Sequence, residues 1–136
     1  MSLTIIKLIS KKYGGNIRIN EPYTGMIQFP FECAEFEDIL RKTDGITEIM
    51  PHPETDEMIE ISRVIYSYDR MKKESGFFAD EYDIECIPFS DDGADITYYF
   101  RRDGKIYGYD PIDGEEFYTA DTAEAFFEEQ TSEIGK

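Results

Sequence analysis

The sequence predicts an α+β fold with about four helices and an antiparallel sheet of about five to six strands. Apolar residues recur at helical spacing in the first half of the chain. From Cys86 onward they alternate with polar residues, and Asp-Gly pairs separate the short runs. The 136 residues, 40% of them hydrophobic, suffice for one packed core. No repeat or linker divides the chain, so we expect a single domain over residues 1–136.

Residues 1–28 are expected to form a lead-in helix and strand. The helix covers residues 3–13, where leucines and isoleucines are spaced for one apolar face and lysines occupy the last turn before a Gly-Gly pair. Residues 16–19 alternate polar and apolar side chains, which predicts a short strand. Residues 26–29 are expected to be extended.

Two helices and two strands are predicted in the middle of the chain. Acidic residues at its start, basic residues at its end and an Asp-Gly stop predict a helix over residues 31–43. Residues 46–50 and 58–61 are expected to be strands on either side of a Pro-His-Pro segment. Ser62 is expected to cap a third helix that runs to about residue 74 and has a glycine beyond its end.

The last part of the chain predicts an antiparallel meander followed by a helix. Asp-Gly turns are a strong hairpin signal, and they separate four short runs of alternating residues. These predicted strands are residues 86–89, 96–100, 105–109 and 115–118. The segment Asp121-Thr-Ala-Glu124 is similar to a capping box and opens the last helix. Residues 131–136 are expected to be a frayed tail.

The charge of the chain limits its partners. Thirty acidic and 14 basic residues give a net charge of −16, and residues 77–136 alone carry −13. Nucleic acid and anionic membrane surfaces are therefore excluded as expected partners, because both need clustered Lys and Arg. A basic protein, a cation or no charged partner remain open, since an acidic surface also serves solubility.

The cysteines and the N-terminal residues favour a cytoplasmic location. Cys33 and Cys86 are far apart and outside any CxxC pattern, so we expect free, buried thiols and neither a disulfide framework nor a zinc site. The first 13 residues are too interrupted for a signal peptide, and no apolar run reaches the length of a membrane span. A cytoplasmic protein is the expectation.

The residues that could carry chemistry give little support for an enzyme. The only histidine, His52, lies between two prolines with no neighbouring group to orient it as a base. The Asp-rich turns miss the calcium-loop spacing, because Gly93 and Ile112 occupy positions that should donate oxygen. Phosphate-loop, dinucleotide and zinc-hydrolase motifs are absent. We therefore expect no catalytic residue, no metal site and no cofactor.

Protein binding is the chemistry that the last 60 residues favour. Exposed tyrosines beside carboxylates suit a partner surface, with Tyr as the anchor and Asp as the charge partner. The alternative is a half-buried sheet whose tyrosine hydroxyls reach solvent, since Tyr is a favoured strand residue. The candidate partner-binding residues are Asp91, Asp92, Asp95, Tyr98, Tyr99, Asp110 and Asp113.

Between Phe29 and Glu129 the chain contains, in order, FPFECAEFEDILRKTDGI, IECIPFSDDGADITYYFRRDGKIYGYDP and YTADTAEAFFEE. These stretches resemble the early helix, the central signature and the closing helix of the SUKH superfamily, a group of bacterial immunity proteins related to fungal Smi/Knr cell-wall regulators. The matching residues are Pro30, Phe36, Asp44, Gly45, Pro88, Asp91, Asp92, Gly93, Tyr98, Tyr99, Asp110, Asp121 and Phe126. The chain departs from the pattern in its DDGAD turn, where members often carry another glycine, and in having no tryptophan.

The resemblance implies helices packed on an antiparallel sheet and a group whose bacterial members neutralise toxins delivered between cells. The expected function is therefore an immunity protein that binds a cognate basic toxin domain, such as a nuclease, with its carboxylates in place of phosphates. The alternative is a regulatory or scaffold protein of the Smi/Knr type with an endogenous protein partner. The oligomeric state is left open.

Overall fold

The chain has the α+β fold expected from its sequence, with four helices and seven strands among the described residues. The computed structural model describes residues 2–13, 16–92 and 94–134. The elements are α1 (Ser2–Tyr13), β1 (Ile17–Ile19), α2 (Ala34–Leu40), β2 (Ile46–Pro51), β3 (Met58–Ile65), α3 (Tyr68–Tyr82), β4 (Ile87–Asp91), β5 (Thr97–Phe100), β6 (Ile106–Asp110), β7 (Glu115–Ala120) and α4 (Ala123–Ile134). None of the helices within these ranges combines the length and the apolar composition needed to cross a bilayer.

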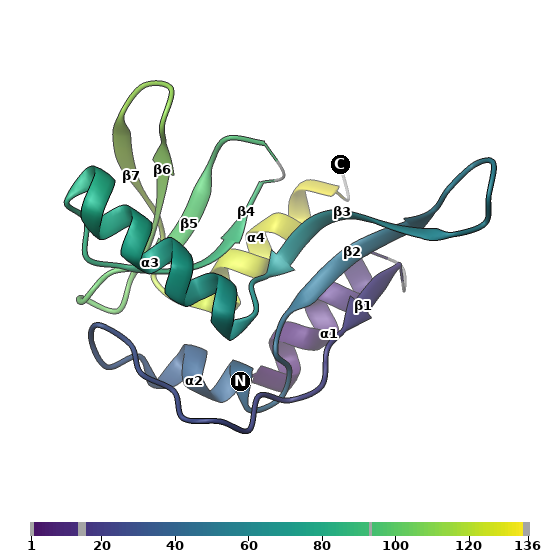
Figure 1. Cartoon of the computed structure of the whole chain (residues 1–136), viewed down its shortest axis with the longest axis horizontal. Coiled ribbons are helices and arrows are strands. Elements are labelled where there is room, and N and C mark those ends of the chain that lie inside the picture. Colours follow the sequence, from purple (N-terminus) through teal and green to yellow (C-terminus); the bar gives the residue numbers. More distant parts are fainter. Residues whose placement is uncertain (1, 14–15, 93, 135–136) are drawn as a thin grey trace.

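The strands form two antiparallel sheets and not the single sheet of five to six strands that we expected. One sheet has the order β1-β2-β3 and the other the order β4-β5-β6-β7, so the predicted meander is confirmed. The backbone N–H of Tyr66, just after β3, donates to the carbonyl of Phe89 in β4 over 2.7 Å and links the two sheets. In Figure 1 the β2–β3 hairpin extends away from the rest of the molecule, and α3 lies across the four-stranded sheet.

The main core lies between the helices and the two sheets. Phe36 of α2 is fully buried, and its ring centre lies 5.7 Å from that of Phe89 and 5.8 Å from that of Phe100. Phe126 and Phe127 of α4 close this cluster on the other side of Phe89. Truncation of a buried phenylalanine to alanine typically costs roughly 3–5 kcal/mol, so these contacts hold the helices against the four-stranded sheet.

A smaller core lies on the opposite face of the four-stranded sheet. There Phe78 of α3 packs on Cys86 and Tyr99, with Tyr82 and Tyr109 at the edge of the cluster. Successive strand residues point to opposite faces, so β5 sends Tyr98 and Phe100 to the main core and Tyr99 to this one. The sheet is therefore covered on both faces along β4 and β5.

The third helix begins later in the sequence than predicted. Ser62 lies inside β3, and the helix starts after Ser67, whose side chain accepts the backbone N–H of Arg70 over 3.3 Å. The residues before helix α3 are rich in β-branched side chains, which favour a strand, and β3 therefore extends to Ile65. Gly76, expected beyond the end of the helix, lies within it.

The bounds of two other helices also differ from the predictions. Helix α2 is confined to residues 34–40 and does not cover the whole of 31–43, and residues 26–29, expected to be extended, lie outside the helices and strands. Helix α4 continues to Ile134, through most of the tail expected to fray. The expected cap by Asp121 is replaced by Thr122, whose Oγ1 accepts the N–H of Ala125, and by Glu35, which accepts the N–H of Ala123. The predicted glycine stop of α1 lies outside the described residues, and α1 itself agrees with its prediction.

Candidate functional site

The meander brings the predicted carboxylates to one end of the four-stranded sheet. The β4–β5 turn carries Asp92 and Asp95, with Asp91 at the last position of β4, and the β6–β7 turn carries Asp113, with Asp110 at the last position of β6. Because β5 runs back from the first turn and β6 returns toward the second, both turns lie at the same end. The fold thus gathers two acidic turns that are separate in the sequence.

Two of these carboxylates also stabilise the turns in which they lie. Asp92 Oδ1 accepts the backbone N–H groups of Ala94 and Ile96 over 2.8 and 3.1 Å. Asp110 Oδ1 accepts the N–H of Ile112 over 2.9 Å. This is the side-chain capping that makes Asp favourable in turns, so replacing either residue would disturb folding as well as charge.

The other three carboxylates differ in exposure. Asp91 is half-buried, and its Oδ2 accepts the hydroxyl of Tyr66 over 2.7 Å. Burial raises the pKa of Tyr66, and the hydrogen bond to Asp91 raises it further. Asp95 and Asp113 are exposed at the two turns. Asp95 and Asp113 are therefore the positions where a charge can be removed with the least damage to the fold.

Neither of the two predicted tyrosine anchors, Tyr98 and Tyr99, is exposed. Tyr99 is 0% exposed, packs on Phe78 with ring centres 5.3 Å apart, and donates its hydroxyl to Glu116 Oε2 over 2.7 Å. Tyr98 is half-buried with its ring 4.8 Å from that of Phe126. The expectation of Tyr99 as an anchor is wrong, because both faces of β5 are covered by helices.

Four other tyrosines gather over β6, β7 and the end of α3, on the face that α3 partly covers; one of them, Tyr118, is exposed and the other three are half-buried. We name this set the tyrosine face: Tyr82, Tyr107, Tyr109 and Tyr118. Tyr109 stacks on Tyr82 with ring centres 4.4 Å apart, and Tyr107 meets Tyr118 edge to face at 6.0 Å. The register pairs Tyr107 with Tyr118 on adjacent strands, which places both rings on the same side of the sheet.

Sequence reasoning did not select these residues as anchors. Tyr107, Tyr109 and Tyr118 are recognisable in the sequence as strand residues, but which face of the sheet α3 covers is not. Tyr82 belongs to a helix that the sequence misplaces. The only signal for the tyrosine face was the alternation of tyrosines along β6, which is typical of buried faces as well.

Carboxylates and one ion pair surround the tyrosine face. Tyr107 donates its hydroxyl to Asp103 Oδ2 over 2.5 Å, and Tyr118 donates to Asp121 Oδ1 over 2.6 Å. The hydrogen bond from Tyr107 lowers the pKa of Asp103 and raises the pKa of Tyr107. Arg101 pairs with Glu116 over 2.6 Å, so its charge is compensated within the face.

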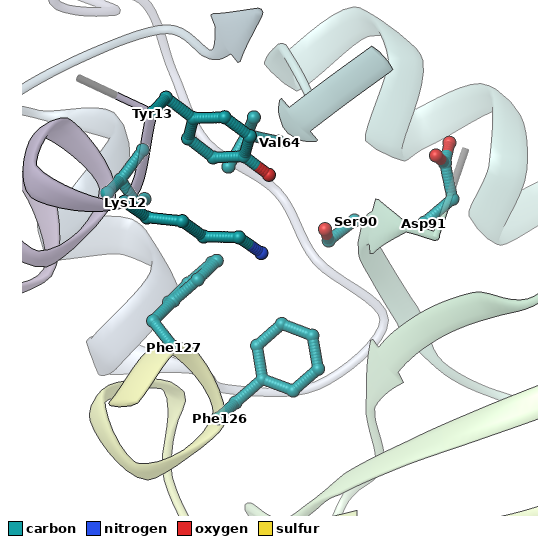
Figure 2. Close-up of a pocket in the computed structure, with 8 residues that line it drawn as sticks. Lys12, Tyr13, Val64, Ser90, Asp91, Phe126 and Phe127 are labelled. Atoms are coloured by element: carbon teal, nitrogen blue, oxygen red, sulfur yellow. The ribbon is translucent and has the colours of Figure 1, made fainter. Parts of the chain in front are cut away.

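A small cavity lies on the other side of the four-stranded sheet, between α1, β3, β4 and α4. Figure 2 shows the Lys12 ammonium and the Tyr13 hydroxyl pointing into it above Phe126 and Phe127, whereas the Asp91 carboxylate points away. Burial raises the pKa of Tyr13 to about 12. The free space is about 20 Å³, which is room for about one water molecule. The cavity is too small for a substrate.

Among the residues that the structure describes, the thiols, the histidine and the carboxylates are not grouped into a metal or catalytic centre. Burial raises the pKa of Cys33 to about 11 and that of Cys86 to about 12, so both thiols stay protonated at neutral pH. His52 lies in the β2–β3 loop, where its Nδ1 accepts the N–H of Glu54. Within residues 2–13, 16–92 and 94–134, no three His, Cys, Asp or Glu side chains are grouped to hold a metal ion.

Fold and surface together define a small α+β domain with two acidic turns and an aromatic face on one four-stranded sheet. Comparison with family models, with curated proteins and with solved structures gives no match.

Proposed function

We propose that this chain is an immunity protein that binds and neutralises a cognate toxin domain with a basic, nucleic-acid-binding surface. The observation that carries the proposal is the placement of two acidic turns at one end of a single sheet, in the half of the chain with a net charge of −13. Its resemblance to the SUKH superfamily supports the same function.

The physical argument is electrostatic. A toxin that cleaves nucleic acid must present Lys and Arg to phosphates, and carboxylates at matching positions would occupy that surface in their place. Opposite charges also accelerate the encounter of the two proteins, and the acceleration falls as salt is added. An inhibitor that blocks an active site needs this charge complementarity and no catalytic centre of its own.

The test is co-expression with the toxin candidates encoded beside this gene, followed by capture from lysate and a survival assay. We expect one candidate to be captured and its toxicity to be suppressed. A panel in which no candidate is captured or neutralised overturns the proposal. Capture of an endogenous protein without any effect on toxicity favours a regulatory scaffold.

A matched pair of variants tests the role of the acidic turns. Asp95→Asn with Asp113→Asn removes two exposed charges from the turns, and Glu54→Gln with Glu57→Gln removes two exposed charges from the β2–β3 loop. We expect the first variant to bind the toxin about tenfold more slowly at low salt and the second to bind as the wild type does. Equal effects of the two pairs would contradict a role for the turns.

A further inference from the structure

Resting on the proposed function, we propose that the tyrosine face is the surface on which arginine side chains of the basic partner dock. The set was defined above as Tyr82, Tyr107, Tyr109 and Tyr118. Phe77 on α3 borders it and is 48% exposed, and its ring lies 5.5 Å from that of Tyr82. The rings form two groups on one side of the sheet: Phe77, Tyr82 and Tyr109 at the end of α3, and Tyr107 with Tyr118 on the last two strands.

The tyrosine face is partly exposed, whereas Tyr99 on the same side of the sheet is fully covered. Phe78 of α3 seals Tyr99 and reaches Tyr109, with ring centres 5.3 and 5.7 Å apart. Beyond this contact Tyr118 is 55% exposed, and Tyr107 is half-buried. Aromatic side chains of this size are the residues most often found as anchors in protein interfaces, and here Tyr118 lies on the edge strand β7 and Tyr107 on the neighbouring strand β6.

The hydroxyl groups of two of these rings are already engaged. Tyr107 donates to Asp103 and Tyr118 to Asp121, and both carboxylates come from turns next to the strands. These hydrogen bonds hold the ring orientations, so binding loses little side-chain entropy. A phenol that donates to a carboxylate also has a more electron-rich ring. The groups available to a partner on the tyrosine face are therefore ring surfaces and carboxylate oxygens.

That combination matches the chemistry of a guanidinium group. Arginine stacks on aromatic rings and hydrogen-bonds to carboxylates at the same time, whereas the ammonium of lysine stacks less well. The chain uses this pairing internally, because the Arg70 guanidinium lies 5.2 Å from the centre of the Tyr66 ring. Two cations lie beside Tyr107, and both are paired: Arg101 with Glu116 and Arg102 with Glu85. The face therefore attracts and does not repel a basic protein.

The test compares two short peptides of equal charge, one alternating arginine with glycine and the other lysine with glycine. We expect wild-type protein to bind the arginine peptide several-fold more tightly. Replacing both Tyr107 and Tyr118 by Leu should abolish this preference while leaving the weaker binding of the lysine peptide unchanged, since the formal charges stay the same. The control is Phe117→Leu, which alters an exposed ring on the opposite face of β7.

A second measurement needs no substitution. Ring-proton NMR signals of Tyr107 and Tyr118 in the wild-type protein should shift more with the arginine peptide than with the lysine peptide. Equal affinities for the two peptides, or a preference that survives in the double Leu variant, overturn the assignment of the tyrosine face.

The toxin-capture experiment separates this inference from the proposed function. Capture that is equal for wild type and the double Leu variant leaves the immunity function standing and refutes the docking surface. Absence of any captured toxin, with the arginine preference lost in the variant, refutes the immunity function and leaves the docking surface standing.

Discussion

Glu35 connects two helices that are far apart in the sequence. It lies on α2, and its Oε1 accepts the backbone N–H of Ala123, the first residue of α4, over 2.7 Å. The carboxylate thus satisfies one of the backbone N–H groups at the start of α4 that have no partner within the helix. Burial raises the pKa of Glu35 above its ordinary value of 4.5, although the hydrogen bonds from Ala123 and Glu124 act in the opposite direction.

We predict that Glu35→Gln gains stability relative to the wild type as the pH rises above about 4.5. A raised carboxyl pKa favours folding below the unfolded-state value, and that contribution is lost as the group ionises. Glutamine keeps the carbonyl that accepts from Ala123 and does not ionise. The measurement is urea unfolding of both proteins between about pH 4 and pH 7. A stability difference that stays constant over this range would contradict the assignment of burial as the main cause.

Gly45 occupies a position where a side chain would be both strained and crowded. Its φ is +107°, and a Cβ there would lie 3.0 Å from the backbone nitrogen of Ser67 and 3.1 Å from the carbonyl oxygen of Ile65. Both are backbone atoms held at the junction of β3 and α3, so neither can move aside cheaply. Gly104 has a similar φ of +82° but has open space around its Cβ position.

We therefore predict that Gly45→Ala lowers the free energy of unfolding clearly more than Gly104→Ala does. Both substitutions carry the strain of a positive φ, which costs about 1 kcal/mol or more, and only the first adds contacts with backbone. Thermal and urea unfolding of the two variants measure the difference. Equal losses would mean that the chain around Gly45 relaxes.

At the scale of elements, α3 contains a residue that weakens it. Gly76 lies inside the helix, is exposed, and has nothing within 4 Å of the position of an added Cβ. Glycine in a helix interior costs about 1 kcal/mol relative to alanine, because its unfolded chain has more conformational freedom to lose.

We predict that Gly76→Ala raises the free energy of unfolding by about 1 kcal/mol, while the matched change Ser67→Ala, which removes the N-terminal cap of the same helix, lowers it by about 1 kcal/mol. Chemical unfolding of the two variants and the wild type provides the measurement. A destabilising Gly76→Ala would indicate that α3 does not have the regular helical geometry described.

The sequence predicted most elements correctly where the local signals agree. Helix α1 and the four strands of the meander have apolar periodicity and turn residues that point to the same structure. Helix α3 was misplaced because a serine at residue 62 satisfied the capping rule, yet the β-branched residues around it pair with β2. In the candidate site, the sequence identified the carboxylates of the turns. It did not identify Tyr99 as buried, because the alternation of residues along a strand does not show which face of the sheet a helix covers.

For the whole molecule, the net charge of −16 opposes the compact state. Four salt bridges are described, and their partners are at least partly exposed. Each exposed pair contributes about 0–1 kcal/mol, and we expect repulsion among the excess carboxylates to outweigh these contributions.

We predict that Tm rises by several degrees when NaCl is increased from about 0.02 M to about 0.5 M, because the Debye length falls to a few ångströms and repulsion is screened. Thermal unfolding in NaCl and in KCl, followed by circular dichroism, checks the direction and shows that it does not depend on the cation. A Tm that falls with both salts would mean that ion pairs dominate.

The sequence by itself determined the fold class, the meander, the acidity of the last 60 residues and the free state of the two thiols. These properties depend on composition and on local spacing, which a single chain displays directly. The tertiary structure alone decided that the strands divide into two sheets, that the two acidic turns share one end, and that α3 buries Tyr99 while leaving the tyrosine face partly exposed. Such features depend on contacts between residues that are distant in sequence, and the periodicity of a strand or helix does not show which element covers which face.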